Sequence, residues 1–467
     1  MDLKELVSRG VRNEYNNSTE GNHLIPAFNS LNTSTNTITE IITKGKLPES
    51  GLSELEIELL INQLAQLDSN NWQDKVPAGE REGRVFSKIV AKRNYNLAHG
   101  IGRSGNLVAA QPKARGSSVI LSLAHALACD ALQVAGYRKL CSSVKNCLLL
   151  PVCTGMALNL SFMAIKKERS DSKVIIWARI DQASCYKSML IGGVFEVCVV
   201  ELTRDTVSNS LYCNPDDIAA AVTKHGAENV LAIHLTSSCF APREPDRILE
   251  ICKFAKSQNI PVVVNNAYGI QSTKSAGMID EAFSRKDCSI DYVVSSMDKN
   301  FMVPVGGSIV LGKHIAKISQ MYAGRASIQP MLDLMITLLE MGLGSWKNLL
   351  KERVAVFEFL KEKLKELEVK FPGLIVYEIK KNNIQIALEL PDYVGEDLGA
   401  KLFHRNVTGC RVIKFDVDRT KFGFKSWGSH TNEEFKPYLT VAASIGTTRN
   451  DAVRFIQKLV NCLSSKK

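Results

Sequence analysis

The sequence contains no uninterrupted apolar segment close to the roughly 20 residues that a helix needs to cross a bilayer. Its opening segment, MDLKELVSRGVRNEYNN, lacks the apolar core of a secretory signal and the acid-free, Arg/Ser-rich character of a transit peptide. These absences argue against a membrane protein and against an exported one. We therefore expect a cytoplasmic protein with no membrane partner.

Cysteines in metal-binding pairs are also missing. The chain has 12 cysteines, but it contains no C-x-x-C pair and no H-x3–5-H pair, so we expect no metal site. Cys141, Cys147 and Cys153 are evenly spaced, yet two of them flank the apolar segment CLLLPVC. Buried, reduced thiols in a reducing compartment are the favoured interpretation.

The excess of positive over negative charge is also small. The 58 Lys and Arg residues nearly balance 48 Asp and Glu residues, which leaves a net charge of +10 over 467 residues. That excess permits a polyanionic partner without requiring one. Hydrophobic residues make up 45% and charged residues 23% of the chain, as is typical of a folded globular protein.

Three parts of the chain differ in pattern. Residues 1–75 combine Asn/Thr-rich segments with amphipathic helical patterns, which indicates a helical oligomerisation extension that packs on the chain itself or on a second subunit. Residues 76–330 form the predicted large domain, where short apolar runs such as KVIIWA and IPVVVN alternate with helical segments. This alternation predicts an α/β fold with a mostly parallel sheet. Residues 331–467 begin with a long helical stretch, broken near residues 342–344, and continue as a smaller α+β domain.

A glycine-rich segment, HGIGRSGNLVAAQPKARGSS, satisfies the pattern G-x-G-x-x-G at residues 100–105. A dinucleotide site would need a strand before this loop, but RVFSKIVAKRNYNLAH has a helical pattern, so that interpretation fails. What remains is a flexible loop with Arg103, Ser104 and Gln111, which suits a phosphate. An exposed basic surface loop is the alternative. Arg81, in the nearby GEREGR segment, could likewise belong only to an ion-paired helix start.

Lys299 stands between two apolar stretches, although lysine is almost never fully buried without a partner or a chemical role. It follows the predicted strand IDYVVSS, and Asn265 ends the predicted strand IPVVVN. Both would then lie at the carboxyl ends of parallel strands, where ligands bind. Partial desolvation favours the neutral amine of a lysine, which can form a Schiff base with pyridoxal phosphate. A structural lysine paired with Asp298 is the alternative.

Pyridoxal phosphate makes two further demands on a protein. Its phosphate needs donors, for which Gln182, Arg81 or the pair Thr154 and Gly155 are candidates, and its ring nitrogen needs a partner, for which Asn265 is placed. Enzymes of this architecture usually supply an aspartate there. A neutral asparagine would stabilise a protonated ring less, which suits chemistry that passes quickly to elimination.

Seven motifs, in order along the chain, extend this interpretation: GEREGR, HGIGRSGNLVAAQPKA, ARIDQASCYKSM, TSSCFAPREPDR, VVNNAYGIQS, SSMDKNFMVPVGGSIV and MYAGRAS. Together they resemble the O-phosphoseryl-tRNA(Sec) selenium transferases, the eukaryotic and archaeal selenocysteine synthases, from about residue 45 to the end of the chain. The resemblance implies a fold type I pyridoxal-phosphate enzyme that is cytoplasmic and homotetrameric, with active sites at dimer interfaces.

The resemblance also implies roles for individual residues. Lys299 would be the Schiff-base lysine, and Arg81 would contact the cofactor phosphate, from the neighbouring subunit. The segment 102–112 would be the phosphate-binding loop. The residues that would touch the phosphoseryl group are Arg103, Ser104, Gln111 and Arg325.

Contacts with tRNA are implied at two places. Lys286 falls where the family has an arginine, with Arg285 beside it, and His404 and Arg405 fall at a second contact. The basic C-terminal extension of the family is shortened here to SSKK, which puts any contact from that end in doubt.

The implied reaction converts O-phosphoseryl-tRNA(Sec) to selenocysteinyl-tRNA(Sec) with selenophosphate, and Lys299 would act as the general base at Cα. The expected partners are therefore the charged tRNA, selenophosphate and further copies of the chain, with no DNA and no membrane. Two alternatives remain open at this point. One is another fold type I enzyme, such as a cysteine desulfurase or a tRNA-dependent cysteine synthase, and the other is a non-catalytic RNA-binding relative.

Overall fold

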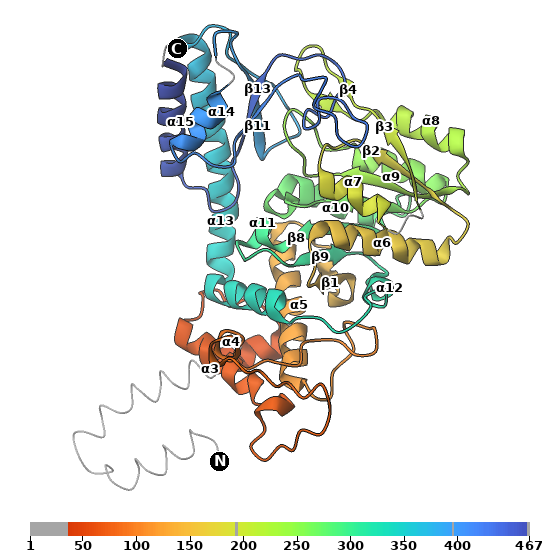
Figure 1. Ribbon diagram of the computed structural model, residues 1–467, viewed down its shortest axis with the longest axis vertical. Coiled ribbons are helices and arrows are strands. Elements are labelled where there is room, and N and C mark those ends of the chain that lie inside the picture. Colours follow the sequence, from red (N-terminus) through yellow and green to blue (C-terminus); the bar gives the residue numbers. More distant parts are fainter. Residues whose placement is uncertain (1–35, 192–194, 395–396, 465–467) are drawn as a thin grey trace, which may run out of the picture.

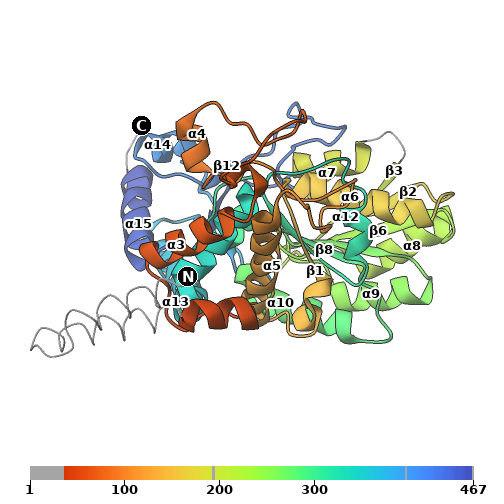
Figure 2. The same cartoon turned by 90° about the horizontal axis from the view of Figure 1, so that it is seen from below.

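The computed structural model describes residues 36–191, 195–394 and 397–464 (Figures 1 and 2). Its centre is a seven-stranded sheet in the order β1-β9-β8-β7-β6-β2-β3. The strands of this sheet are β1 (Cys147–Leu150), β2 (Val174–Ala178), β3 (Glu196–Val200), β6 (Val230–Thr236), β7 (Val262–Asn265), β8 (Tyr292–Ser296) and β9 (Ser308–Leu311).

The sheet is mostly parallel, as predicted. Strands β3, β2, β6, β7 and β8 pair in parallel, and β9 runs antiparallel between β8 and β1. All residues of β2, β6 and β7 are buried, and most are Val, Ile or Leu. Such continuous apolar runs are characteristic of strands covered on both faces.

Helices cover both faces of the sheet. Figure 2 shows α6, α7 and α12 on one side and α8, α9 and α10 on the other. Their bounds are α6 (Thr154–Glu168), α7 (Ala183–Leu190), α8 (Pro215–His225), α9 (Ile248–Ser257), α10 (Thr273–Ser284) and α12 (Ile315–Ser319). Their ends follow local sequence signals. Helix α8, for example, begins with Asn214 as its cap and Pro215 in the first turn, and it ends at Gly226 with φ 79°.

One helix of the described chain, α5 (Arg115–Ala135), is long and apolar enough to cross a membrane by length and composition. Most of its apolar window is buried inside the protein, where α5 packs against α13 (Gln329–Lys370). The indole of Trp346 on α13 donates a hydrogen bond of 2.9 Å to the carbonyl of Ala131. Packing within the core therefore accounts for the apolar character of α5.

Helix α13 connects the two parts of the molecule. It bends at Gly342, as the sequence predicted, where φ is 64° and a Cβ atom would lie 2.5 Å from the backbone nitrogen of Gly51. Only glycine fits that position. In Figure 1 the helix runs from the side of α5 up to the smaller unit at the C-terminal end.

The smaller unit is built on a four-stranded antiparallel sheet in the order β10-β11-β13-β12. A separate apolar cluster lies between this sheet and the helices. The elements are β10 (Ile375–Val376), β11 (Gln385–Glu389), β12 (Arg411–Ile413), β13 (Tyr438–Ala442), α14 (Leu398–His404) and α15 (Arg449–Ser464). The predicted fold class is thereby confirmed.

The N-terminal part is helical at residues 36–44 and at α3 (Glu54–Ala65). Ser53 and Glu56 form a capping box at the start of α3, and the buried face of this helix packs on α5 and α13. Residues 1–35 of the predicted extension lie outside the described residues. The remaining short elements are η1 (Ser69–Asn71), α4 (Lys88–Arg93), η2 (Leu140–Ser142), η3 (Val144–Asn146), β4 (Thr203–Arg204), β5 (Leu211–Tyr212), η4 (Gly269–Gln271) and α11 (Met297–Phe301).

Candidate active site at the strand ends

Four predicted site residues lie at the carboxyl ends of strands in the large sheet. Lys299 is on α11, directly after β8, and Asn265 is the last residue of β7. Gln182 caps α7 after β2, and Thr154 begins α6 after β1. Because these strands share one direction, their carboxyl ends meet at one edge of the sheet, which is the usual place for a ligand in such folds.

The backbone around Lys299 is fixed, whereas its amine is accessible. The Gln271 amide donates to the carbonyl of Lys299 at 3.2 Å and accepts from the backbone N–H of Ile445 at 2.7 Å, so it joins α11 to the smaller unit. The Lys299 side chain is 49% exposed, and its Nζ donates to Ser296 Oγ at 3.3 Å. The predicted alternative, an ion pair with Asp298, is present at 3.6 Å. A half-exposed ion pair of this kind stabilises a fold little, so it does not explain why a lysine stands at this position.

The start of α6 offers a cradle for a phosphate. The cap residue Cys153 makes no side-chain hydrogen bond to the first turn, and the buried Thr154 hydroxyl has no hydrogen-bond partner in the described part of the chain. A Cβ atom on Gly155 would lie 3.1 Å from the carbonyl oxygen of Ser184, so the glycine lets α6 and α7 begin side by side. Orphan N–H groups at a helix start together with an unused hydroxyl fit the phosphate of pyridoxal phosphate.

Gln182 is already partly committed. Its Oε1 accepts hydrogen bonds from the Ser184 backbone N–H at 2.6 Å and from the Ser184 hydroxyl at 2.7 Å, which caps α7. Its amide nitrogen is the group left to contact a ligand.

The two neighbouring asparagines differ in role. Asn266 donates to Tyr137 Oη at 2.7 Å and to Ser295 Oγ at 3.1 Å, and it accepts from the Ser237 hydroxyl. It is therefore a buried structural residue. Asn265 accepts from the Ala267 backbone N–H at 3.2 Å and donates to Cys185 Sγ at 3.5 Å, and one of its amide hydrogens remains available.

Two further predicted residues, Arg81 and Arg325, line a pocket of about 590 Å³ together with His99, Glu80 and Glu82. Arg325 donates to the His99 carbonyl, and its Nε is buried without a hydrogen-bond partner in the described chain. Burial and then the charge of Arg81 lower the pKa of Arg325. Two cations are thus held close together, a geometry that calls for an anion.

The glycine loop is attached beside Arg325, and we call Arg81, Arg325 and the loop residues Arg103, Ser104 and Gln111 the arginine group. Ile101 and Ala326 exchange backbone hydrogen bonds of 2.9 and 3.1 Å, which places the loop beside Arg325. Arg103 and Ser104 are exposed, and Ser104 has a φ of 50°. Gln111 donates to the Gly102 carbonyl at 3.4 Å and so closes the loop on itself.

The two groups are not joined by polar contacts within the described chain. Among the described residues, no hydrogen bond or ion pair joins the Lys299 group to Arg81, Arg325 or the loop that follows residue 100.

The predicted tRNA contacts lie on separate units. Lys286 is exposed beyond the end of α10, but the neighbouring Arg285 is bound by Asp287 at 2.9 Å, so much of its charge is neutralised inside the chain. His404 and Arg405 are exposed at the end of α14 in the smaller unit.

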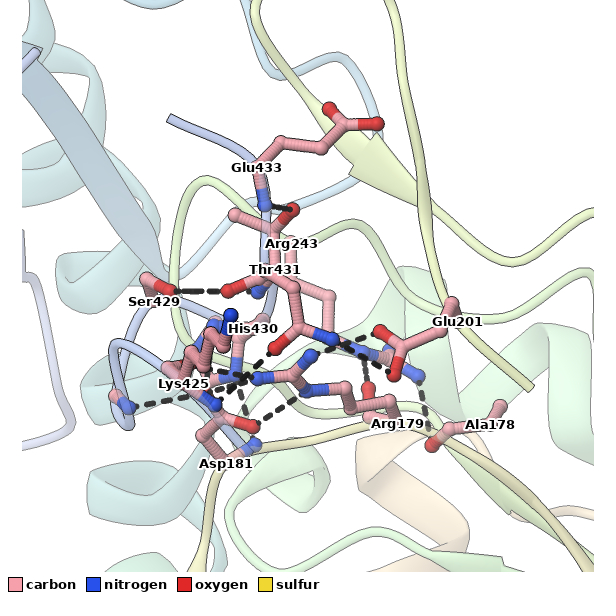
Figure 3. A network of polar contacts seen from close by, with 12 residues as sticks. Ala178, Arg179, Asp181, Glu201, Arg243, Lys425, Ser429, His430, Thr431 and Glu433 are labelled. Carbon is pink, nitrogen blue, oxygen red and sulfur yellow. Dashed lines mark hydrogen bonds and ion pairs between the residues drawn. The ribbon is translucent and has the colours of Figure 1, made fainter. Parts of the chain in front are cut away.

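A buried charged network at the end of β2 has no counterpart among the predicted site residues (Figure 3). Arg179 Nε donates to Asp181 Oδ1 at 2.9 Å, and Nη1 donates to Glu201 at 2.8 Å. Asp181 Oδ2 accepts from the backbone N–H groups of Gly428 and His430 at 2.9 and 2.8 Å. The smaller unit is therefore fastened to the residue that directly precedes Gln182.

A second buried pair completes this network. Arg243 binds Asp246 at 2.8 Å and donates to the carbonyl of Arg179 at 2.8 Å. The motifs ARIDQ and APREPDR contain both arginines, and charged residues between apolar neighbours were the available signal. Their spacing could not reveal that Asp181 is bonded to His430, 249 positions further along the chain.

The chain is similar to known proteins over nearly its whole length. A family model described as O-phosphoseryl-tRNA(Sec) selenium transferase (SepSecS) matches residues 67–464. The chain is 37% identical over 474 residues to the O-phosphoseryl-tRNA(Sec) selenium transferase of Dictyostelium discoideum, with 96% of this chain and 97% of that one covered. The protein of the same name from Caenorhabditis briggsae is 38% identical over 430 residues, with 90% and 87% covered.

Solved structures agree with these relatives. The crystal structure of an archaeal O-phosphoseryl-tRNA(Sec) selenium transferase matches with a TM-score of 0.85 and 29% identity, covering 94% of this chain and 97% of that one. A cysteine desulfurase from Thermococcus onnurineus matches with a TM-score of 0.55 and 11% identity, covering 80% and 90% of the two chains, and shares the fold alone. The predicted fold type I architecture is confirmed.

Proposed function

The chain belongs to the family of O-phosphoseryl-tRNA(Sec) selenium transferases, and from that premise we propose that it converts O-phosphoseryl-tRNA(Sec) to selenocysteinyl-tRNA(Sec). Selenophosphate is the proposed selenium donor. The observation that carries the proposal is the match to the family over residues 67–464, which includes the complete set of strand ends around Lys299.

The cofactor of this family is pyridoxal phosphate, and the residues at the strand ends fit it. Lys299 would hold the aldehyde carbon, Thr154 and Gly155 the phosphate, and Asn265 the ring nitrogen. When bound, this cofactor supplies an electron sink for the bond to hydrogen at the substrate Cα.

Lys299 is proposed as the general base. Its amine lies on a short helix whose backbone is held by Gln271, while the side chain is half exposed and can move between the cofactor and the substrate Cα. Ser296 Oγ, 3.3 Å from Nζ, would guide the amine between these positions.

Arg103, Gln111 and Arg325 are proposed to bind the phosphate of the phosphoseryl group and to stabilise it as it leaves. Charge-assisted hydrogen bonds from guanidinium groups are strong and directional. A site built for a dianion is left without its partner by a seryl hydroxyl, which would explain selection for phosphoserine.

The active site is proposed to form between subunits of a homotetramer, with Arg81 supplied by the neighbouring subunit. The lack of polar contacts between the two groups within the described chain supports this. So do the exposed apolar side chains near Arg81 in the sequence, among which Val76 is 88% exposed and Ile89 81%. A monomer would leave this surface in water.

Mixing two inactive variants tests the shared site. Lys299→Ala and Arg81→Ala proteins should each be inactive, and mixed subunits should regain activity because one site in a mixed dimer keeps both residues. If the mixture stays inactive while mixed dimers are detected by mass, the shared site is wrong.

The tRNA is proposed to bind mainly through its phosphates, at Lys286, Arg285, His404 and Arg405. Affinity measured by filter binding should then fall steeply as salt rises. A flat response would argue against these contacts. The proposed location is the cytoplasm, and imaging of a tagged protein would test it.

The activity itself is tested with purified, cofactor-loaded protein. Phosphoseryl-tRNA(Sec) and selenophosphate should yield selenocysteinyl-tRNA(Sec), and borohydride reduction followed by peptide mapping should place the cofactor on Lys299. Release of sulfur from free cysteine, without turnover of the charged tRNA, would instead indicate a cysteine desulfurase.

A further inference from the structure

Four buried side chains lie in a continuous series beneath the carboxyl end of β7. Asn265 Nδ2 is 3.5 Å from Cys185 Sγ, and that sulfur is 3.8 Å from His234 Nε2. The other ring nitrogen, His234 Nδ1, is 3.4 Å from Met189 Sδ. Cys185, His234 and Met189 are at most 2% exposed, and Asn265 is 5% exposed.

The direction of the hydrogen bonds in this series is fixed by its last member. A thioether sulfur carries no hydrogen and can only accept, so His234 must donate from Nδ1. Burial lowers the pKa of His234 to about 3, so the imidazole is neutral and its Nε2 is an acceptor. The group that faces Nε2 must therefore be a donor.

The donor is the thiol of Cys185. Burial raises the pKa of Cys185 to about 12, so its proton stays on sulfur and points toward His234. The sulfur then has only lone pairs to offer to Asn265. It follows that the Asn265 atom facing Cys185 is the amide nitrogen and not the oxygen.

The contact of the Asn265 amide oxygen independently supports the same orientation of the amide. The backbone N–H of Ala267 is always a donor, and it points at the Asn265 oxygen from 3.2 Å. A rotated amide would set donor against donor at Ala267 and would leave the buried Nε2 of His234 without its proton donor. Both ends thus select one orientation of the amide.

Charged groups near the series do not reverse it. Arg243 lies close enough to lower the pKa of His234 further, and Asp246 acts on Cys185 in the opposite sense. At Cys185 the charge of Arg243 lowers the pKa and that of Asp246 raises it, and the two residues are paired with each other at 2.8 Å.

We infer that Asn265 offers its remaining amide N–H to the ring nitrogen of pyridoxal phosphate, and that this nitrogen is therefore held as an unprotonated acceptor. Met189, His234 and Cys185 are positioning residues that fix the amide. The inference rests on the proposed function, in which Asn265 faces the ring.

This arrangement has a consequence for the reaction. A ring without a proton on nitrogen withdraws electrons less strongly. Arg103, Gln111 and Arg325, which are proposed to bind the phosphate, would then contribute by stabilising it as it leaves.

The test is nitrogen NMR of the protein loaded with ring-15N pyridoxal phosphate. The wild-type resonance should lie in the unprotonated pyridine range, and Asn265→Asp should move it to the protonated range because a carboxylate accepts. A protonated ring in the wild type would overturn the inference.

Variants of Cys185 test the positioning role. Cys185→Ser keeps both the donor and the acceptor and should reproduce the wild-type resonance. Cys185→Ala removes both, so the resonance should shift or broaden and the cofactor should bind about fivefold more weakly, as expected for one lost hydrogen bond. An unchanged resonance and affinity in Cys185→Ala would show that the series does not position Asn265.

Failure of the proposed function gives a different result. If borohydride reduction leaves no cofactor on Lys299, the proposed function and this inference both fall. If the cofactor is found on Lys299 and its ring nitrogen is protonated, only this inference falls.

Discussion

Polar side chains at the strand ends differ from those in the arginine group in their burial and in their bonding partners. At the strand ends, Asn265, Asn266 and Asp181 are buried and bonded within the chain. In the arginine group, Arg81 and Arg103 are exposed, and no carboxylate of the described chain forms an ion pair with them or with Arg325.

This difference separates what one chain can complete from what it leaves for others. A buried polar group without a partner costs folding free energy, so Asn265, Asn266 and Asp181 form their hydrogen bonds when the chain folds, whereas the Thr154 hydroxyl stays available for a ligand. The exposed guanidinium groups of Arg81 and Arg103 stay hydrated until a phosphate binds. We therefore expect most substitutions at the strand ends to lower stability, and those in the arginine group to lower turnover alone.

Lys299→Ala gives the largest expected effect and sharpens the comparison, because this residue is at the strand ends yet is half exposed. Turnover should fall at least about a thousandfold, since both the cofactor bond and the general base are lost. The melting temperature of the cofactor-free protein should hardly change. The exposed Lys274→Ala variant on α10 is the matched control and should keep full activity.

Asp181→Asn should break the strand-end region. It leaves the buried Arg179 with the half-exposed Glu201 as its remaining carboxylate partner in the described chain. The new amide group also sets its hydrogens toward Arg179 or toward the N–H groups of Gly428 and His430. Removing one partner of a buried pair costs about 3–5 kcal/mol. Denaturant unfolding of the cofactor-free protein measures this cost.

A surface pair provides the control for Asp181→Asn. Glu433 lies 3.8 Å from Arg204 and is 66% exposed, so Glu433→Gln should change the free energy of unfolding by less than about 1 kcal/mol. Equal losses in the two variants would contradict the view that burial sets the cost.

The sequence was sufficient to predict the sheet and the positions of Lys299 and Asn265. Continuous Val/Ile runs specify buried parallel strands locally, and ligands gather at the carboxyl ends of such strands. The break of α13 at Gly342 was predictable for a similarly local reason.

The partners of these residues were not predictable. Cys185 and His234 meet only because β2, β6 and α7 pack side by side. Gln271 binds both Lys299 and Ile445, and Ile445 lies 174 positions after Gln271 in the chain. No spacing rule encodes such contacts. The domain boundaries and the individual site residues remain predictions for the experiments described above.

Arg325→Ala should break the arginine group without touching the fold of the strand ends. One charge-assisted hydrogen bond to the substrate phosphate is worth about 1.5–3 kcal/mol, so turnover of phosphoseryl-tRNA should fall about 10- to 100-fold. The absorption band of the bound cofactor should be unchanged. Arg325→Lys should recover only part of the loss, because an ammonium cannot bind bidentately.

Loss of the cofactor absorption band in Arg325→Ala would contradict the proposed role of this arginine. If the variant lost the cofactor band together with its activity, the arginine would belong to the cofactor site rather than to the phosphoseryl site.

The smallest expected effect is the loss of stability over a single pH unit in mild acid, and it sharpens the comparison because buried neutral histidines occur in the strand-end region. Burial lowers the pKa of His430 to about 4, although Asp181 opposes the shift. Between about pH 6.5 and pH 4 the unfolded chain binds a proton that the folded chain refuses, so stability falls as the pH falls through this window. The slope is about 1.4 kcal/mol per pH unit for each such histidine.

Two histidine variants test this origin of the acid sensitivity. His430→Asn keeps an acceptor for the Asp181 N–H and should reduce the slope, whereas the exposed His404→Asn should retain it. Equal slopes in the two variants, measured by urea unfolding across this range, would mean that the acid sensitivity arises elsewhere in the chain.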